Sequence, residues 1–194
     1  MTSLNSGFKL TSMKKLSTYL FLILFSFSVP SFSDDISDFQ IEGMSIGDSL
    51  LDYFSEEEIK NNVVHVYEDK KFTISEYKKS FELYDALGFA YKTDDKKYMV
   101  QGIQGHIDFI DDIKNCYKKQ DEIVEELSSL FVNQEKIEYG IESLEPDEKG
   151  TWKPINFEFS NGTAVSVTCY KLDLYDDHLK ITLYTKEYKD YVSR

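Results

Sequence analysis

The chain has 194 residues, and 35 Asp and Glu residues outnumber 22 Lys and Arg residues to give a formal net charge of −13. This excess of acid argues against nucleic-acid binding, because phosphate recognition needs concentrated Lys and Arg. Hydrophobic residues make up 41% of the chain and aromatic residues 15%, which excludes wholesale disorder, and the length suits one domain.

Residues 1–33 have the composition of a secretory signal peptide. Lysines without any acidic residue precede an apolar run from Leu16 to Val29, and the small residues Ser31 and Ser33 follow it. The run is shorter than the roughly 20 residues that a helix needs to cross a bilayer. We therefore expect cleavage after Ser33, with Met13 as an alternative start of translation and a retained membrane anchor as the alternative outcome. Cleavage predicts a periplasmic or secreted bacterial protein without a stable membrane anchor.

Residues 34–194 are predicted to form a single α+β domain. Capping-box patterns, in which an acid follows a hydroxyl residue by three positions, begin at Ser45 and Ser55 and predict two short helices, about 46–54 and 56–61. Strand candidates follow at 63–67, 71–74, 81–91 and 98–108. The glycines inside the two longer strands, Gly88, Gly102 and Gly105, indicate bulges or close backbone approach.

The segment 108–132 is the clearest helix, because its apolar residues recur at spacings of three and four. Two prolines and a glycine predict that 133–156 is mostly irregular. Strict alternation then predicts strands around 157–159, 165–169 and 179–183, with a hairpin turn at Asn161 and Gly162 and a short closing helix at 187–192. The expected fold is an antiparallel sheet of about six strands, with the long helix packed across its apolar face and the two short helices preceding it.

The two cysteines lie on apolar rows of predicted elements. Cys116 shares the apolar stripe of the long helix, and Cys169 shares the apolar row of its strand. Two inward-facing cysteines that meet in an oxidising compartment form a disulfide, and closure of the intervening loop predicts about 4 kcal/mol of stabilisation. Two reduced core residues are the alternative.

Few residues match known catalytic or metal-binding patterns. The turn with Asp173, Asp176 and Asp177 offers carboxylates for calcium but lacks the spacing and the glycine of an EF-hand, so a solvated turn is the favoured interpretation. His178 follows this turn and is the histidine that a hydrolase using Asp or Glu would employ. No cofactor-binding motif is present, and we expect no cofactor.

Tyrosine and threonine alternate with the apolar row on the last two strands. Thr168, Tyr170, Thr182 and Tyr184 are predicted to lie on the sheet face opposite that row. Aromatic residues on an uncovered sheet face make a recognition surface, whereas the alternative is the ordinary preference of Tyr and Thr for strands.

Three segments of the chain carry a resemblance to other proteins. Residues 38–51, residues 115–119 and residues 177–179 together resemble a group of small exported bacterial proteins of unknown function, which implies no activity. Separately, the sequence Gly43-Met44-Ser45 running into a short helix resembles the start of SmpA/OmlA-like and β-lactamase-inhibitor-like domains. That resemblance implies helices packed on an antiparallel sheet and binding to other proteins. This sequence lacks the lipid-bearing Cys and the Leu-Gly-x-Pro motif of those domains.

The expected function is a non-enzymatic periplasmic or secreted interaction module that contacts another envelope protein or a cationic ligand through its sheet or its acidic surface. Two alternatives are a small envelope hydrolase that uses Asp or Glu with His178, and a calcium-binding acidic protein.

Overall fold

The computed structural model describes residues 36, 39–78, 81–144, 147–173 and 175–193. The predicted signal peptide and the alternative start at Met13 lie outside these residues. The helical elements are the 3-10 helix η2 (Leu50–Asp52), α2 (Glu56–Asn61), α3 (Ile113–Leu130) and α4 (Lys186–Val192). The strands are β1 (Val63–Val66), β2 (Phe72–Tyr77), β3 (Ala86–Lys92), β4 (Val100–Phe109), β5 (Glu135–Glu138), β6 (Glu142–Leu144), β7 (Asp147–Glu158), β8 (Ala164–Lys171) and β9 (Asp177–Tyr184). None of the helices in the described part is long and apolar enough to span a membrane.

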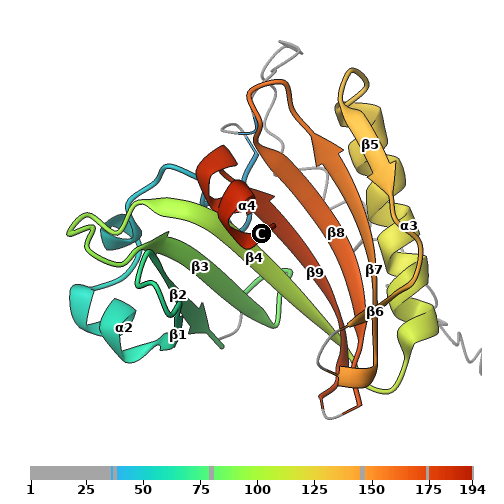
Figure 1. The fold of residues 1–194 in the computed structure, drawn as a ribbon, viewed down its shortest axis with the longest axis horizontal. Helices are drawn as coiled ribbons and strands as arrows, with labels where there is room; N and C mark the ends of the chain where they lie inside the picture. Colours follow the sequence, from blue (N-terminus) through green and yellow to red (C-terminus); the bar gives the residue numbers. More distant parts are fainter. Residues whose placement is uncertain (1–35, 37–38, 79–80, 145–146, 174, 194) are drawn as a thin grey trace, which may run out of the picture. The chain divides into compact units, whose positions relative to one another are not determined.

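The fold is α+β, as predicted, and its antiparallel sheet contains nine strands rather than about six (Figure 1). The strand order is β1-β2-β3-β4-β9-β8-β7-β5, and β6 pairs with β7 beside this path. The pairing of β4 with β9 joins the two halves of the sheet, which are far apart in the sequence. β1 is an edge strand, and all four of its residues are exposed.

The predicted helix over residues 46–54 is wrong except for the three residues of η2. The carboxylate of Asp48 accepts a hydrogen bond from the Ser45 backbone N–H at 2.9 Å, and Gly47 has a φ of +88°. A left-handed residue at this position turns the chain and prevents a helix from continuing through it. The second prediction is confirmed, because Ser55 and Glu58 form both hydrogen bonds of a capping box at the start of α2.

The expectation of irregular structure over 133–156 is also wrong, because β5, β6 and most of β7 lie there. Pro154 fits within β7 because an N–H at this position would point away from the neighbouring strand β8. The Tyr139 N–H donates to the Pro154 carbonyl at 3.3 Å, so this side of Pro154 faces the end of β5. The N–H and C=O of a strand residue point the same way, so the proline removes no hydrogen bond to β8.

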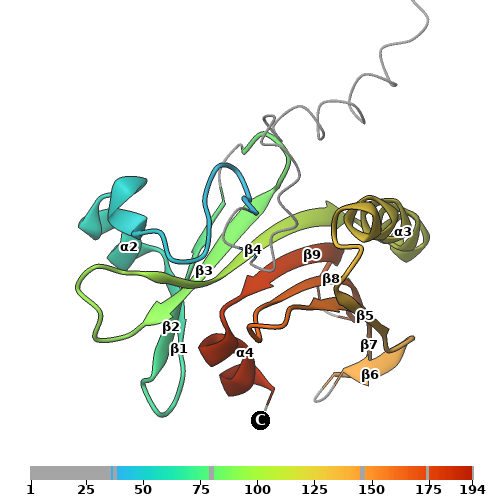
Figure 2. The same ribbon diagram turned by 90° about the horizontal axis from the view of Figure 1, so that it is seen from above.

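The two helices α3 and α4 lie on opposite faces of the sheet (Figures 1 and 2). The face beneath α3, called here the α3 face, carries the main apolar core, which includes Leu87, Ile103, Val167 and Leu183. The opposite face, called here the α4 face, has a small apolar cluster of Phe72, Ala90 and Tyr188 where α4 packs. Alternation along each strand therefore divides its residues between an apolar core and a second, more polar face.

The disulfide prediction is confirmed. Cys116 of α3 and Cys169 of β8 are bonded, with their Cα atoms 6.0 Å apart. Both residues are fully buried in the α3-face core. The helix that contains Cys116 begins later than predicted, because Asp112 caps its N-terminus by accepting the Asn115 N–H at 3.2 Å.

Candidate functional site

The α4 face carries the four residues that the sequence predicts as a binding surface. Thr168 and Tyr170 lie on β8, and Thr182 and Tyr184 lie on β9, all on the face opposite Cys169 and Leu183. The neighbouring positions in register are Ser166 with Thr182, Thr168 with Lys180, and Tyr170 with His178. The structure therefore brings the predicted residues together and adds charged and aromatic neighbours to them.

The hydroxyl residues of this group are buried although they alternate away from the main core. Thr182 is 2% exposed, Thr168 3% and Ser166 6%. The Ser166 and Thr168 hydroxyls are 2.9 Å apart and form a hydrogen bond. α4 lies over the end of β9 near Tyr184, whereas the end near His178 has no described helix in front of it (Figure 1). We call this group of residues the polar patch; it comprises His106, Asn156, Ser166, Thr168, Tyr170, His178, Lys180 and Thr182.

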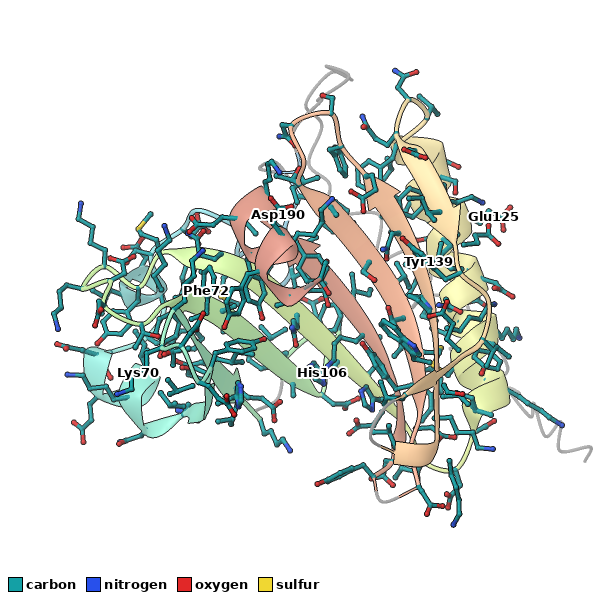
Figure 3. All side chains as sticks on the ribbon, in the orientation of Figure 1. Lys70, Phe72, His106, Glu125, Tyr139 and Asp190 are labelled. Atoms are coloured by element: carbon teal, nitrogen blue, oxygen red, sulfur yellow. A yellow bond between two sulfur atoms is a disulfide. The ribbon has the colours of Figure 1, made fainter. Side chains whose placement is uncertain are left out.

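Aromatic rings form a row across four strands at one side of the polar patch. The ring centroids of Trp152 on β7 and Tyr170 on β8 are 6.2 Å apart. The Tyr170 ring stacks on His178 at 4.9 Å, and the His178 ring stacks on His106 of β4 at 5.6 Å. Figure 3 shows His106 on β4, away from the end of the sheet at which Phe72 lies beside α4. Because neighbouring rings pack against one another, the row holds these side chains in fixed positions.

Lys180 occupies the centre of the polar patch. In register, it lies between Thr168 on β8 and His106 on β4. Its ammonium group is 5.0 Å from the centroid of the Tyr170 ring, a cation–π contact. Within the described residues its Nζ atom has no carboxylate within ion-pair distance. Burial lowers the pKa of Lys180, and the negative charge of Glu76 opposes that effect.

Two further polar atoms of the patch are buried without a hydrogen-bond partner. They are the Nε2 atom of His106 and the Oδ1 atom of Asn156. Burial, together with the nearby positive charges of Lys180 and His178, lowers the pKa of His106 to about 3. Its imidazole is therefore neutral at neutral pH. An unpaired buried polar atom costs free energy, so both atoms mark positions where a ligand group is favourable.

The aspartates considered for calcium do not come together as a metal site. Asp173 forms an ion pair with Lys149 at 3.0 Å, and Asp177 is buried at the start of β9. The backbone carbonyl of Asp176 lies 3.1 Å from Nδ1 of His178. Among the described residues, no three His, Cys, Asp or Glu side chains are arranged to hold a metal ion.

The hydrolase alternative needs His178 to pair with an acid. Asp108 is in register with His178 on the neighbouring strand, and its charge raises the pKa of His178, whereas burial lowers it more strongly. In the described part of the chain no hydrogen bond joins His178 to a carboxylate or to a serine or threonine hydroxyl. The catalytic pairing of this alternative is therefore not formed in the structure.

Sequence reasoning missed Lys180, His106 and Asn156 as members of the candidate site. Lys180 stands between Leu179 and Ile181, so the alternation that placed Thr182 also indicated its face. No local pattern indicated that β4 would pair with β9, and Asn156 fell in the segment expected to be irregular, so neither His106 nor Asn156 was assigned to this face.

Comparisons with protein-family models, with curated proteins and with solved structures find no match to this chain.

Proposed function

We propose that this protein is a non-enzymatic binding module that acts outside the cytoplasm and holds a small ligand against the polar patch. The observation that carries the proposal is a group of polar side chains on one face without a partner among the described residues: the Lys180 ammonium has no ion pair, and the Nε2 atom of His106 and the Oδ1 atom of Asn156 are buried without a hydrogen bond. Buried polar groups in a stable fold are normally paired with one another, so a patch with several unpaired groups is typical of a ligand site.

Two further features support this proposal. The disulfide between Cys116 and Cys169 suits an oxidising compartment, in agreement with the predicted export. The sequence predicts an envelope protein or a cationic ligand as the partner. The unpaired ammonium of Lys180 disfavours a cation at the polar patch, and the largely buried side chains favour a small molecule over a protein surface.

The proposal is tested on protein expressed from the full chain and purified gently from the compartment where it accumulates. Native mass spectrometry is expected to show a retained small molecule that is lost on denaturation, and intact mass reports whether the leader has been cleaved. Trp152→Ala removes one end of the ring row and should reduce retention. Tyr175→Ala, which alters a ring that is 76% exposed outside the polar patch, is the matched control. Equal retention by both variants, or no retained molecule, would contradict the proposal.

A further inference from the structure

The chemistry of the unpaired groups limits the kind of ligand that the polar patch accepts. Lys180 supplies a positive charge with three donors and no acceptor. The charge of Glu76 acts on Lys180, and Glu76 itself forms an ion pair with Lys78 at 3.4 Å; His106 and His178, whose pKa values the Lys180 charge helps to lower, also face this position. An anionic oxygen is the group that compensates a largely buried ammonium, because charge-assisted hydrogen bonds are about twice as strong as neutral ones.

His106 adds a second feature next to this charge. His106 and Lys180 are register partners on adjacent strands, and the Nε2 atom of His106 is buried without a partner. In the tautomer that carries its proton on Nε2, the neutral imidazole donates a hydrogen bond. An oxyanion between these two side chains therefore gains two donors.

Asn156 indicates what the rest of the ligand contains. Its Oδ1 atom is an unpaired acceptor, so it requires a donor such as a hydroxyl group. Asn156 lies on β7, two strands from Lys180 on β9, and is in register with Ser166 and Thr182. Two strand spacings, combined with the two-residue offset between Thr182 and Lys180 along β9, place the backbones of Asn156 and Lys180 about 12 Å apart. A molecule of monosaccharide size matches this separation better than a bare anion does.

We infer that the polar patch binds a hydroxylated carboxylate of monosaccharide size, with its carboxylate at Lys180 and His106 and its hydroxyl groups toward Asn156. The inference rests on the proposed function and narrows it to a ligand class. A purely apolar ligand would leave the ammonium of Lys180 and the Oδ1 atom of Asn156 unpaired.

The test uses calorimetric titration of the protein purified from full-chain expression. The probes are D-glucuronate, D-galacturonate and D-gluconate. The controls are D-glucose, which lacks the carboxylate, and acetate, which lacks the hydroxyl groups. At least one sugar acid should bind about tenfold or more tightly than both glucose and acetate. That factor corresponds to one hydrogen bond to a charged group. Binding of none of the three sugar acids, or equal binding of acetate, would overturn the inference.

Lys180→Met removes the charge and should weaken sugar-acid binding about tenfold to a hundredfold. Lys171→Met is the control, because Lys171 is exposed on β8 and lies on the α3 side of the sheet. Amide chemical-shift mapping on the wild-type protein is a second measurement that needs no variant. It should give the largest changes near residues 106, 156 and 180, and changes confined to other parts of the chain would refute the assignment.

This experiment separates the inference from the proposed function. If the protein retains a neutral molecule on the polar patch and Lys180→Met does not change that retention, the proposed binding function stands. The inferred ligand class is then refuted. If native mass spectrometry finds no retained molecule and the sugar acids cause no chemical-shift change on the α4 face, the proposed function and the ligand class are both refuted.

Discussion

His106 shows how burial changes the behaviour of a titratable side chain in this fold. Its pKa is lowered to about 3, chiefly by burial and further by the positive charges of Lys180 and His178. In the unfolded chain a histidine has a pKa of about 6.5. Below that pH the unfolded chain binds a proton that the folded protein does not bind. The stability that neutral His106 contributes is therefore present above pH 6.5 and is lost as the pH falls toward 3.

We predict that the contribution of His106 to the free energy of unfolding decreases by about 1–2 kcal/mol between pH 7 and pH 5. Urea denaturation across this pH range should show this loss of stability. In the His106→Gln variant the stability should depend less steeply on pH. The lowered pKa of His178 acts in the same direction and should leave a smaller residual slope. His65→Gln, on the exposed strand β1, is the matched control for a His-to-Gln change outside the polar patch. An unchanged slope in His106→Gln would contradict the prediction.

At the scale of elements, the packing of α4 against the sheet depends on the absence of a side chain at Gly102. A Cβ atom at this position would lie 2.6 Å from two carbons of the Tyr188 ring. Tyr188 is 1% exposed and stacks edge-on with Phe72 at 5.1 Å, so its ring is held from both sides. The sequence-based expectation of close backbone approach at Gly102 is confirmed, and its cause is the docking of α4.

We predict that Gly102→Ala lowers the free energy of unfolding by about 1–3 kcal/mol, because the added methyl group displaces the Tyr188 ring. Gly88→Ala is a matched control on the same face of the neighbouring strand β3, where the nearest atom to a new Cβ is 3.5 Å away. This variant should be unchanged or more stable by up to about 1 kcal/mol, since alanine restricts the unfolded chain. Equal losses in the two variants, measured by urea denaturation, would show that the contact with Tyr188 is not the cause.

For the whole molecule, the disulfide links the long helix to the centre of the second half of the sheet. Cys116 and Cys169 are separated by 53 residues, and the loop between them contains the rest of α3 together with β5, β6, β7 and most of β8. A cross-link of this length restricts the unfolded chain more than it restricts the folded one. The bond therefore stabilises much of the fold rather than one local turn.

We predict that replacing both cysteines by alanine lowers the free energy of unfolding by about 4 kcal/mol. A reductant should move the denaturation midpoint of the wild-type protein toward that of the Cys116→Ala, Cys169→Ala variant. The same reductant should leave the variant unchanged, which controls for effects unrelated to the bond. A wild-type midpoint that is insensitive to reductant after complete reduction would argue against the predicted contribution.

Local sequence patterns predicted much of the fold for identifiable physical reasons. Alternation along β8 and β9 placed Cys169 and Tyr170 on opposite faces, because successive strand residues point to opposite sides. The capping box at Ser55 was predicted because both of its hydrogen bonds are local. The failure at Ser45 has an equally local cause. The same residue pattern formed a turn there, because Gly47 adopts a left-handed conformation and Asp48 bonds back to Ser45.

The sequence by itself determined the faces of β8 and β9, the capping box at Ser55 and the inward positions of Cys116 and Cys169, since periodicity and spacing set these features. Only the tertiary structure decided that β4 pairs with β9 and that β7 extends from the predicted hairpin back over Asn156. Those pairings bring His106, Lys180 and Asn156 onto one patch from three separate segments. Partners across strands depend on long-range register, and a local pattern carries no information about which distant strand becomes the neighbour.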